Sequence, residues 1–199
     1  MWRRRILMLK FYYGVMASGK SATLLMSAYQ KEKDGNSVLL LKPYDQRDEY
    51  KICSRVGLSK ECVVFDNNTN MIHLIAGIGQ VYKHIYIDEC QFLTNEQVLQ
   101  LWKLSNAGID ISCFGLKTTF KNELFDSIKT LIVHADETKT IQPPCNCKYC
   151  DNIANTHLLF VNDEVALDVP EKFEGDVEGT TRFECVCQSC WYEKTEKLK

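Results

Sequence analysis

The chain has 199 residues, which suits one ordinary domain or one domain plus a small appendage, and its 45% apolar and 11% aromatic residues are enough for a buried core. Its formal net charge is −2, so no basic field indicates nucleic acid or an anionic membrane as a partner. The apolar run after Arg5 is interrupted by Lys10, is too short to span a membrane, and has no small-residue cleavage site after it. We therefore predict a cytoplasmic protein.

Strands alternate with helical patterns before residue 142, which is typical of βαβ units and a parallel sheet. An amphipathic helix follows the first predicted strand and ends near Asp34 and Gly35, and a second helix covers residues 95–108. The fold class that this order predicts is α/β. The predicted strands span residues 6–13, 37–41, 84–88, 111–115 and 130–136.

The composition changes at Pro143 and Pro144, which mark a linker before a cysteine-rich part. We therefore expect two domains, a larger one over residues 1–142 and a smaller one over residues 143–199. Within the smaller domain, residues 168–182 are polar and contain glycine, which predicts a mobile loop.

The segment GVMASGKS fits the phosphate-binding pattern G-x-x-x-x-G-K-[ST]. Its glycines let backbone N–H groups turn toward phosphate oxygens, and the following helix N-terminus adds its dipole. Lys20 would reach the β- and γ-phosphates of ATP, and the Ser21 hydroxyl would bind Mg²⁺. A glycine turn with a solvated lysine is the structural alternative, but the flanking strand and helix favour a nucleotide site. The predicted ATP-binding residues here are Gly14, Val15, Met16, Ala17, Ser18, Gly19, Lys20 and Ser21.

Two adjacent carboxylates, Asp88 and Glu89, stand at the end of the predicted strand 84–88. In phosphate-loop folds an acid in this place holds the Mg²⁺ water shell, and Asp88 suits that role. Glu89 could activate water, as in an ATPase, or accept the proton of a substrate hydroxyl, as in a kinase. A solvated acid pair that starts a turn is the structural alternative. Phe92 follows closely and could wall a slot for a flat base or simply belong to the core.

Six of the ten cysteines crowd into two short clusters, CNCKYC at 145–150 and CVCQSC at 185–190. Each cluster contains C-x₂-C, and four thiolates from two turns make a closed, structural Zn²⁺ site. The extra Cys145 and Cys185 leave a C-x-C pairing open. Disulfides are the alternative, disfavoured in a reducing cytosol. The predicted zinc ligands are Cys147, Cys150, Cys187 and Cys190.

The segments FYYGVMASGKSATLL, DECQFLT, GLKTTFKNELF and the paired C-terminal cysteines resemble, in this order and spacing, the zinc-containing thymidine kinase family. The resemblance runs from Leu9 to about Tyr192. It implies a P-loop (RecA-like) parallel-sheet domain and a small C-terminal zinc-binding domain whose loop, the lasso, closes over thymidine. It further implies the reaction ATP + thymidine → dTMP + ADP in nucleotide salvage, with catalytic Mg²⁺, structural Zn²⁺, a homo-oligomer (commonly a tetramer) and feedback inhibition by dTTP.

The resemblance also implies roles for single residues. Glu89 corresponds to the base that takes the proton of the deoxyribose 5′-OH, while Lys20 and Arg47 neutralise charge on the transferring phosphoryl group. Asp45 would support the metal; a surface salt-bridge pair is the structural alternative for Asp45 and Arg47. The predicted ATP site also includes Asp45 and the acidic-motif residues Asp88, Glu89, Cys90 and Gln91, with Cys90 as a packing residue.

Several residues match positions that wall the base or adjoin it. Phe183 stands where the family commonly has Tyr, and Glu178-Gly179 matches the usual Gly-Gly of the lasso only in part. His157 would face the base or be an exposed loop histidine. These departures leave open a broader pyrimidine deoxynucleoside kinase. A third alternative is an ATP-dependent nucleic-acid module with a zinc ribbon, against which the short, slightly acidic chain counts. The predicted base-site residues are Met16, Phe92, Leu116, Phe120, His157, Gly179 and Phe183.

Overall fold

The computed structural model describes residues 8–44, 50–147, 149–169 and 181–196. The chain divides into two compact units. Unit 1 comprises residues 1–13, 19–115 and 126–140, and unit 2 comprises residues 14–18, 116–125 and 141–199. The domain boundary expected after residue 142 stays a prediction, and the two inserted segments, 14–18 and 116–125, were not part of it.

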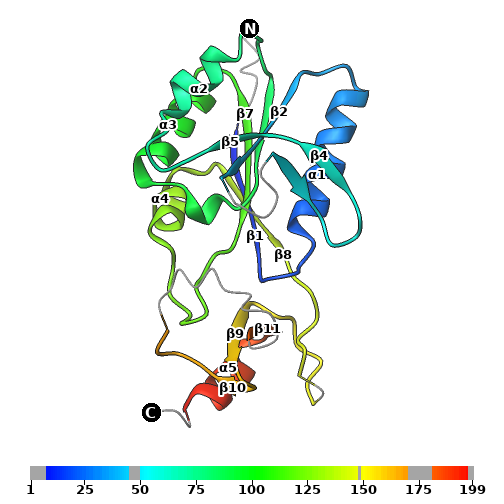
Figure 1. The fold of residues 1–199 in the computed structure, drawn as a ribbon, viewed down its shortest axis with the longest axis vertical. Helices are drawn as coiled ribbons and strands as arrows, with labels where there is room; N and C mark the ends of the chain where they lie inside the picture. The colour runs from blue at the N-terminus through cyan, green and yellow to red at the C-terminus, as the bar shows by residue number, and fades with distance from the viewer. Residues whose placement is uncertain (1–7, 45–49, 148, 170–180, 197–199) are drawn as a thin grey trace, which may run out of the picture. The chain divides into compact units, whose positions relative to one another are not determined.

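Unit 1 is built on a six-stranded sheet with the order β5-β2-β6-β7-β1-β8 (Figure 1). The neighbouring pairs β5–β2, β2–β6, β6–β7 and β7–β1 are all parallel. Strands buried on both faces need continuous apolar runs, which Leu39–Leu41 and Ile85–Ile87 supply. The α/β class with a mostly parallel sheet is therefore confirmed. The strands are β1 Leu9–Gly14, β2 Val38–Pro43, β5 Val63–Phe65, β6 His84–Ile87, β7 Asp110–Gly115 and β8 Glu137–Ile141.

Helices lie on both sides of this sheet: α1 is on one side, and α2, α3 and α4 are on the other (Figure 1). Helix α1 ends with Asp34 as its C-cap, as its sequence predicted. Helix α3 starts with a capping box between Thr94 and Gln97, which explains its sharp N-terminus. The helices are α1 Lys20–Lys33, α2 Met71–Gly77, α3 Asn95–Asn106 and α4 Asp126–His134; a short hairpin, β3 Lys51–Cys53 and β4 Ser59–Glu61, and a 3₁₀ turn, η1 Cys90–Phe92, complete the unit.

The strand predicted at 130–136 is wrong, because most of this segment belongs to helix α4. Ile128 and Leu131 are fully buried and three residues apart, which is helical spacing, whereas Ile132 and Val133 are 41% and 77% exposed. The β-branched residues suggested a strand, but the packing of one helical face outweighs that local preference. The next strand, β8, begins only at Glu137.

Unit 2 contains a three-stranded antiparallel sheet, in the order β10-β9-β11, followed by a short helix. On one face of this sheet Leu158, Phe160 and Val186 pack against cysteines of the two C-terminal clusters. On the other face Cys185 packs with Val15 and Ala154. The elements are β9 Thr156–Val161, β10 Glu164–Val165, β11 Thr181–Val186 and α5 Gln188–Thr195.

Some predictions fall on residues that the structure does not describe. They concern Asp45, Arg47, Gly179 and most of the loop expected at 168–182. Among the described residues, no helix has the length and apolarity that crossing a membrane requires.

Candidate active site

The predicted phosphate loop begins where β1 ends. Gly14 is buried, and a Cβ atom there would collide with the Ile141 carbonyl oxygen and the Ser18 side chain, so only glycine fits. Ala17 has a φ of +56° and Gly19 a φ of +85°, both in the left-handed region. Such backbone reversals turn successive peptide groups, as an anion-binding loop requires. Residues 14–18 belong to unit 2 and residues 19–21 to unit 1.

Two carbonyl groups of this loop have identified donors within unit 2. The Val15 oxygen accepts the Ser18 N–H at 3.3 Å, and the Met16 oxygen accepts the Cys185 thiol at 2.8 Å. Both bonds help to stabilise a loop whose conformation is unfavourable for a non-glycine residue at Ala17.

In unit 1, Lys20 at the start of α1 is 7% exposed, and Asp88, directly after β6, is 4% exposed. The Ser21 hydroxyl is hydrogen-bonded to the Asp88 carboxylate. Burial, and then repulsion by Glu89, raise the pKa of Asp88 to about 6, although Ser21, the Glu89 N–H and the charge of Lys20 act in the opposite direction. A carboxylate and a hydroxyl held together in this way are oxygen ligands of the kind that Mg²⁺ takes.

Glu89 is held in an uncommon conformation directly after β6. Its φ is +50°, and its N–H donates to Oδ1 of Asp88 at 3.1 Å. The side-chain amide of Gln91 donates to Oε2 of Glu89 at 2.5 Å. Non-glycine residues with positive φ concentrate at functional sites, where the surrounding structure maintains them. The Glu89 carboxylate is thus oriented by Gln91, next in the chain to the buried carboxylate of Asp88.

The sequence reasoning missed two residues that position Gln91. Ser127 of α4 donates from its hydroxyl to the Gln91 carbonyl oxygen at 2.8 Å. A Cβ atom on Gly115, at the end of β7, would lie 2.5 Å from Oε1 of Gln91 and 2.7 Å from Sγ of Cys90. Gly115 therefore leaves the space that the Gln91 amide occupies. The sequence signal that could have identified Gly115 was its position at the end of the strand predicted from ISCFG.

The residues predicted to contact the base fall into both units. In unit 1, Phe92 is 42% exposed, so it is not a core residue of that unit. In unit 2, Phe120 is buried, and its carbonyl oxygen accepts the indole N–H of Trp191 at 3.1 Å. Leu116 is also buried and Met16 is partly buried, both in unit 2.

The structure brings His157 and Phe183 together on neighbouring strands of unit 2. Their ring centroids are 5.6 Å apart in an edge-to-face arrangement. His157 lies in β9 and is 3% exposed, so the alternative of an exposed loop histidine is wrong. Phe183 lies on β11, two residues before Cys185, and the two residues share one face of the sheet with His157.

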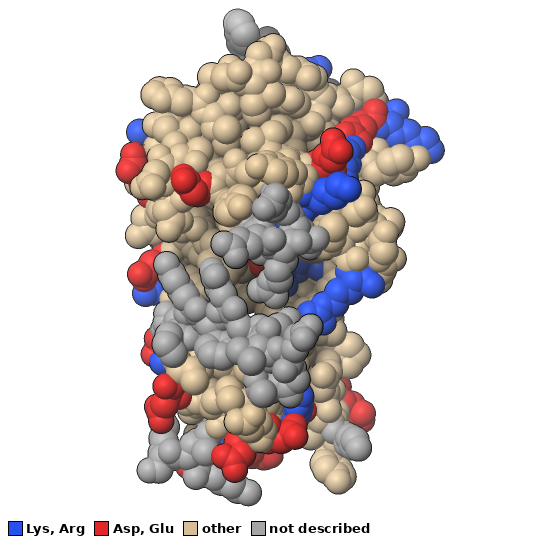
Figure 2. Space-filling view, viewed as in Figure 1, with Lys and Arg blue, Asp and Glu red and all other residues tan. Residues whose placement is uncertain are grey.

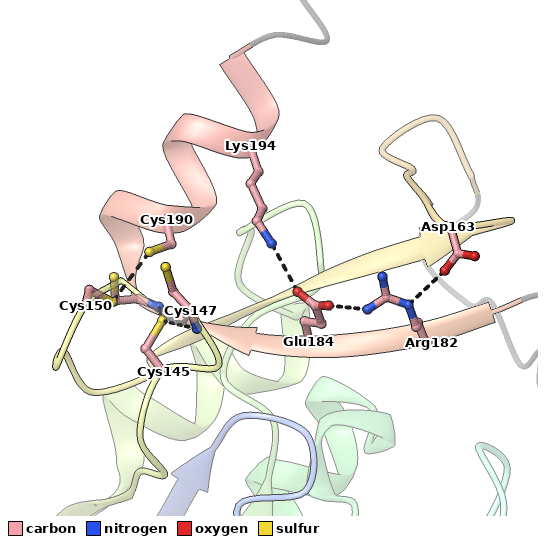
Figure 3. A network of polar contacts seen from close by, with 9 residues as sticks. Cys145, Cys147, Cys150, Asp163, Arg182, Glu184, Cys190 and Lys194 are labelled. Atoms are coloured by element: carbon pink, nitrogen blue, oxygen red, sulfur yellow. Dashed lines mark hydrogen bonds and ion pairs between the residues drawn. The ribbon is translucent and has the colours of Figure 1, made fainter.

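A group of thiols forms the second candidate site, also in unit 2. The sulfur atoms of Cys145, Cys150, Cys187 and Cys190 all lie within 4.8 Å of one another. Figure 3 shows Cys145, Cys150 and Cys190 gathered near the start of α5, with Cys147 beside them. All ten cysteines are free thiols, so no disulfide competes. Four convergent sulfurs suit tetrahedral Zn²⁺.

Backbone donors around these sulfurs strengthen the fit to a cation. The N–H groups of Cys147 and Cys187 donate to Sγ of Cys145 at 3.4 and 3.3 Å, and the Asn152 side chain donates to Sγ of Cys187 at 3.5 Å. The backbone N–H of Cys190 is the main cause that lowers the pKa of Cys187 to about 7. Donors aimed at sulfur favour the thiolate, which is the form that binds metal.

The thiol group differs at one position from the predicted ligand set. Cys145 belongs to it, whereas Cys147 does not. Cys145 is buried, and its N–H donates to the Asn152 carbonyl oxygen at 2.8 Å, so the turn directs its thiol inward. Three cysteines within six residues offered several spacings, and the fold of the turn selects among them.

An ion-pair chain runs along β11 beside the thiols (Figure 3). Glu184 pairs with Lys194 of α5 at 3.1 Å and with Arg182, and Arg182 pairs with Asp163 at 3.3 Å. The Arg182 guanidinium also covers the Phe160 ring at 4.0 Å. These partly exposed pairs connect α5 and the β9–β10 turn to β11, with a modest gain in stability.

Comparison with known proteins adds independent evidence. The family model described as "Thymidine kinase" matches residues 7–191. The thymidine kinase of Vibrio vulnificus (strain CMCP6) is 33% identical over 192 residues, which cover 94% of this chain and 97% of that protein. The thymidine kinase of Photorhabdus laumondii is 34% identical over 196 residues, covering 96% and 95%. That of Legionella pneumophila (strain Paris) is 40% identical over 145 residues, covering 70% and 69%.

Proposed function

The chain belongs to the thymidine kinase family, and from this premise we propose that it transfers the γ-phosphoryl group of ATP to the 5′-OH of thymidine, giving dTMP and ADP. Family membership makes it a kinase and implies that it uses ATP. The observation that carries the proposal is the family match over residues 7–191. The pair of Asp88 and Glu89 supports it, because one carboxylate is buried against a hydroxyl and the next is held by an amide.

In the proposed reaction Asp88 and Ser21 would hold Mg²⁺, and Lys20 would contact the phosphates. When bound, the ion would supply positive charge that favours phosphoryl transfer. Glu89 accepts the proton of the 5′-OH, and the Gln91 amide keeps its carboxylate oriented. Phosphoryl transfer depends on positioning and charge neutralisation more than on covalent chemistry, which fits this residue set. Asp45 and Arg47 are proposed to assist the metal and the phosphoryl group, as the family resemblance implies.

The exposed ring of Phe92 is proposed to stack on thymine. By the family resemblance we also propose six residues of unit 2 as base-contacting residues. His157 and Phe183 carry the strongest support, because their rings share one face of the β9–β11 sheet. Phe183 offers a ring without a hydroxyl, which favours recognition of the base by shape and backbone. The six residues are Met16, Leu116, Phe120, His157, Gly179 and Phe183.

We propose that Cys145, Cys150, Cys187 and Cys190 hold a structural Zn²⁺. The ion would join the turn before β9 to the start of α5, and so fix both ends of the segment between them. The homotetramer, the inhibition by dTTP and the role in nucleotide salvage follow from the family resemblance. The cytoplasmic location follows from the pattern of the N-terminal sequence, and all four are part of the same proposal.

The test is ATP-to-ADP turnover with Mg²⁺ and one added partner at a time: thymidine, deoxyuridine, deoxycytidine, deoxyguanosine or single-stranded DNA. Turnover with thymidine alone, yielding the 5′-monophosphate, is the expected result. Equal turnover with deoxyuridine and deoxycytidine would replace thymidine kinase by a broader pyrimidine deoxynucleoside kinase.

Turnover that responds to DNA and ignores nucleosides would overturn the proposal and assign Glu89 to water activation. The formal net charge of −2 argues against that outcome. Figure 2 shows Lys and Arg intermingled with Asp and Glu on the visible face, and a track for a nucleic-acid backbone needs a field of one sign.

A further inference from the structure

Cys185 is outside the thiol group, yet its side chain makes a specific contact. Its Sγ lies 2.8 Å from the carbonyl oxygen of Met16 and donates to it. Cys185 is 7% exposed and packs with Val15, which is 3% exposed, and with the fully buried Ala154. The thiol therefore reaches the phosphate loop in a dry environment, where a hydrogen bond is stronger than in water.

The acceptor of this bond belongs to the peptide group that joins Met16 to Ala17. A trans peptide is planar, so its C=O and its N–H point in opposite directions. A donor that holds the Met16 carbonyl on one side therefore directs the Ala17 N–H to the other side. Ala17 has a φ of +56°, which a residue with a Cβ rarely adopts without support. The Cys185 thiol is one such support.

Cys185 is itself rigidly placed. It pairs with His157 in the β9–β11 ladder, and its carbonyl oxygen accepts the N–H of Asn146 at 2.8 Å. Asn146 lies next to Cys145, and Cys187 follows Cys185 by two residues. Both partners of this hydrogen bond are therefore close in the chain to cysteines of the thiol group. The strand that carries Cys185 is thus fixed by the same turns that the proposed zinc site joins.

We propose that Cys185 is a positioning residue for ATP: its thiol holds the Met16–Ala17 peptide so that the Ala17 N–H faces a phosphate oxygen. This inference rests on the proposed function, because it needs the loop to bind ATP. In this role Cys185 acts through the loop backbone. It also connects the cysteine-rich end of β11 to nucleotide binding.

The experiment compares two variants of Cys185 in the zinc-loaded full chain. Cys185→Ser keeps a hydrogen-bond donor, whereas Cys185→Val fills the space without one. Mg·ATP affinity is measured by calorimetry, and KM for ATP and for thymidine by steady-state kinetics. Loss of one neutral hydrogen bond predicts roughly 3- to 10-fold weaker ATP binding for Cys185→Val, with Cys185→Ser within about 2-fold of wild type. The zinc content should stay unchanged in both.

Cys113→Ala is the matched control, because Cys113 is also a fully buried thiol but lies in β7 of unit 1. It should lower thermal stability and leave ATP affinity unchanged. Wild-type ATP affinity in Cys185→Val, or an equal loss in Cys185→Ser and Cys185→Val, would overturn the inference. A wild-type chain that binds no ATP would instead overturn the proposed function.

A measurement on the wild type covers the case in which Cys185→Val fails to fold. In protein labelled with ¹⁵N-alanine, the Ala17 amide resonance, assigned with an Ala17→Gly sample, should move when Mg·ATP is added. An Ala17 resonance that stays in place at saturating Mg·ATP would contradict the inference.

Discussion

The carboxylates of unit 1 and the thiols of unit 2 are two clusters of like groups, and they are held in different ways. Asp88 and Glu89 are adjacent in the chain, and each has a separate donor, Ser21 for one and Gln91 for the other. The thiols come from turns about 40 residues apart, and backbone N–H groups donate to their sulfurs. Because each carboxylate has its own donor, the two can be oriented for different tasks. The four sulfur atoms instead point toward one centre, which suits a closed ion site.

We therefore expect the carboxylates to serve the reaction and the thiols to stabilise the fold. Changes at the carboxylates should alter turnover more than folding. Changes at the thiols should alter metal content and folding before any effect on the reaction.

The largest effect is expected from Glu89→Gln. Without a proton acceptor at the 5′-OH, kcat should fall by ~10²–10⁴-fold, while KM for ATP and the melting temperature change little. Steady-state kinetics and thermal unfolding of the same preparation check this. If the Glu89→Gln enzyme kept the wild-type kcat, Glu89 would not be the base, and the contrast between carboxylates and thiols would fail.

Cys145→Ala and Cys147→Ala separate the two possible ligand sets. Cys145→Ala should lose zinc affinity by more than the roughly 10- to 100-fold that removing a hydrogen-bond partner of a ligand costs. Cys147→Ala should keep one zinc per chain and a melting temperature near that of wild type. Metal analysis after dialysis against a weak chelator, with thermal unfolding, gives both readings. The reverse pattern would restore Cys147 as the ligand.

Asp88→Asn tests, through the pH dependence of protein stability, whether the burial of the Asp88 carboxylate opposes folding. The pKa of Asp88 is raised from 3.8 to about 6, so its ionisation opposes folding: its contribution is fully favourable below about pH 4 and is lost as pH rises through about 6. In Mg²⁺-free buffer Asp88→Asn should therefore gain stability over wild type between pH 4 and 7, by up to roughly 3 kcal/mol. Urea unfolding of both proteins measures the difference in the free energy of unfolding. The thiols contribute equally to both proteins and so do not affect this difference. If the stabilities of the two proteins depended on pH in the same way, the ionisation of Asp88 would not oppose folding.

The smallest effect is expected from Gly115→Ala, which sharpens the role of Gln91. The added methyl group would push the Gln91 amide and disturb Glu89, lowering kcat by roughly 10-fold. In the Glu89→Gln background the same change should have little further effect, because coupled residues are not additive. Full additivity in this double-mutant cycle would mean that Gly115 acts elsewhere.

Local motifs of the sequence by themselves determined the α/β class, the helix after the phosphate loop, the adjacent carboxylates and the two thiol clusters. These features depend on neighbours within a few residues: glycine spacing, a buried apolar run that ends in acids, paired cysteines. The family match extends over residues 7–191, which include the helix after the phosphate loop, the adjacent carboxylates and both thiol clusters.

Tertiary structure alone decided which side chains meet. It made residues 130–134 part of a helix, because Ile128 and Leu131 had a surface to pack against. It buried His157 beside Phe183, and it placed Cys145 rather than Cys147 among the four convergent sulfurs. It also brought Cys185 to Met16, which is 169 residues away in the chain. Spacing along the chain restricts which residues can be neighbours, but a contact between distant segments forms only once both strands and turns are packed.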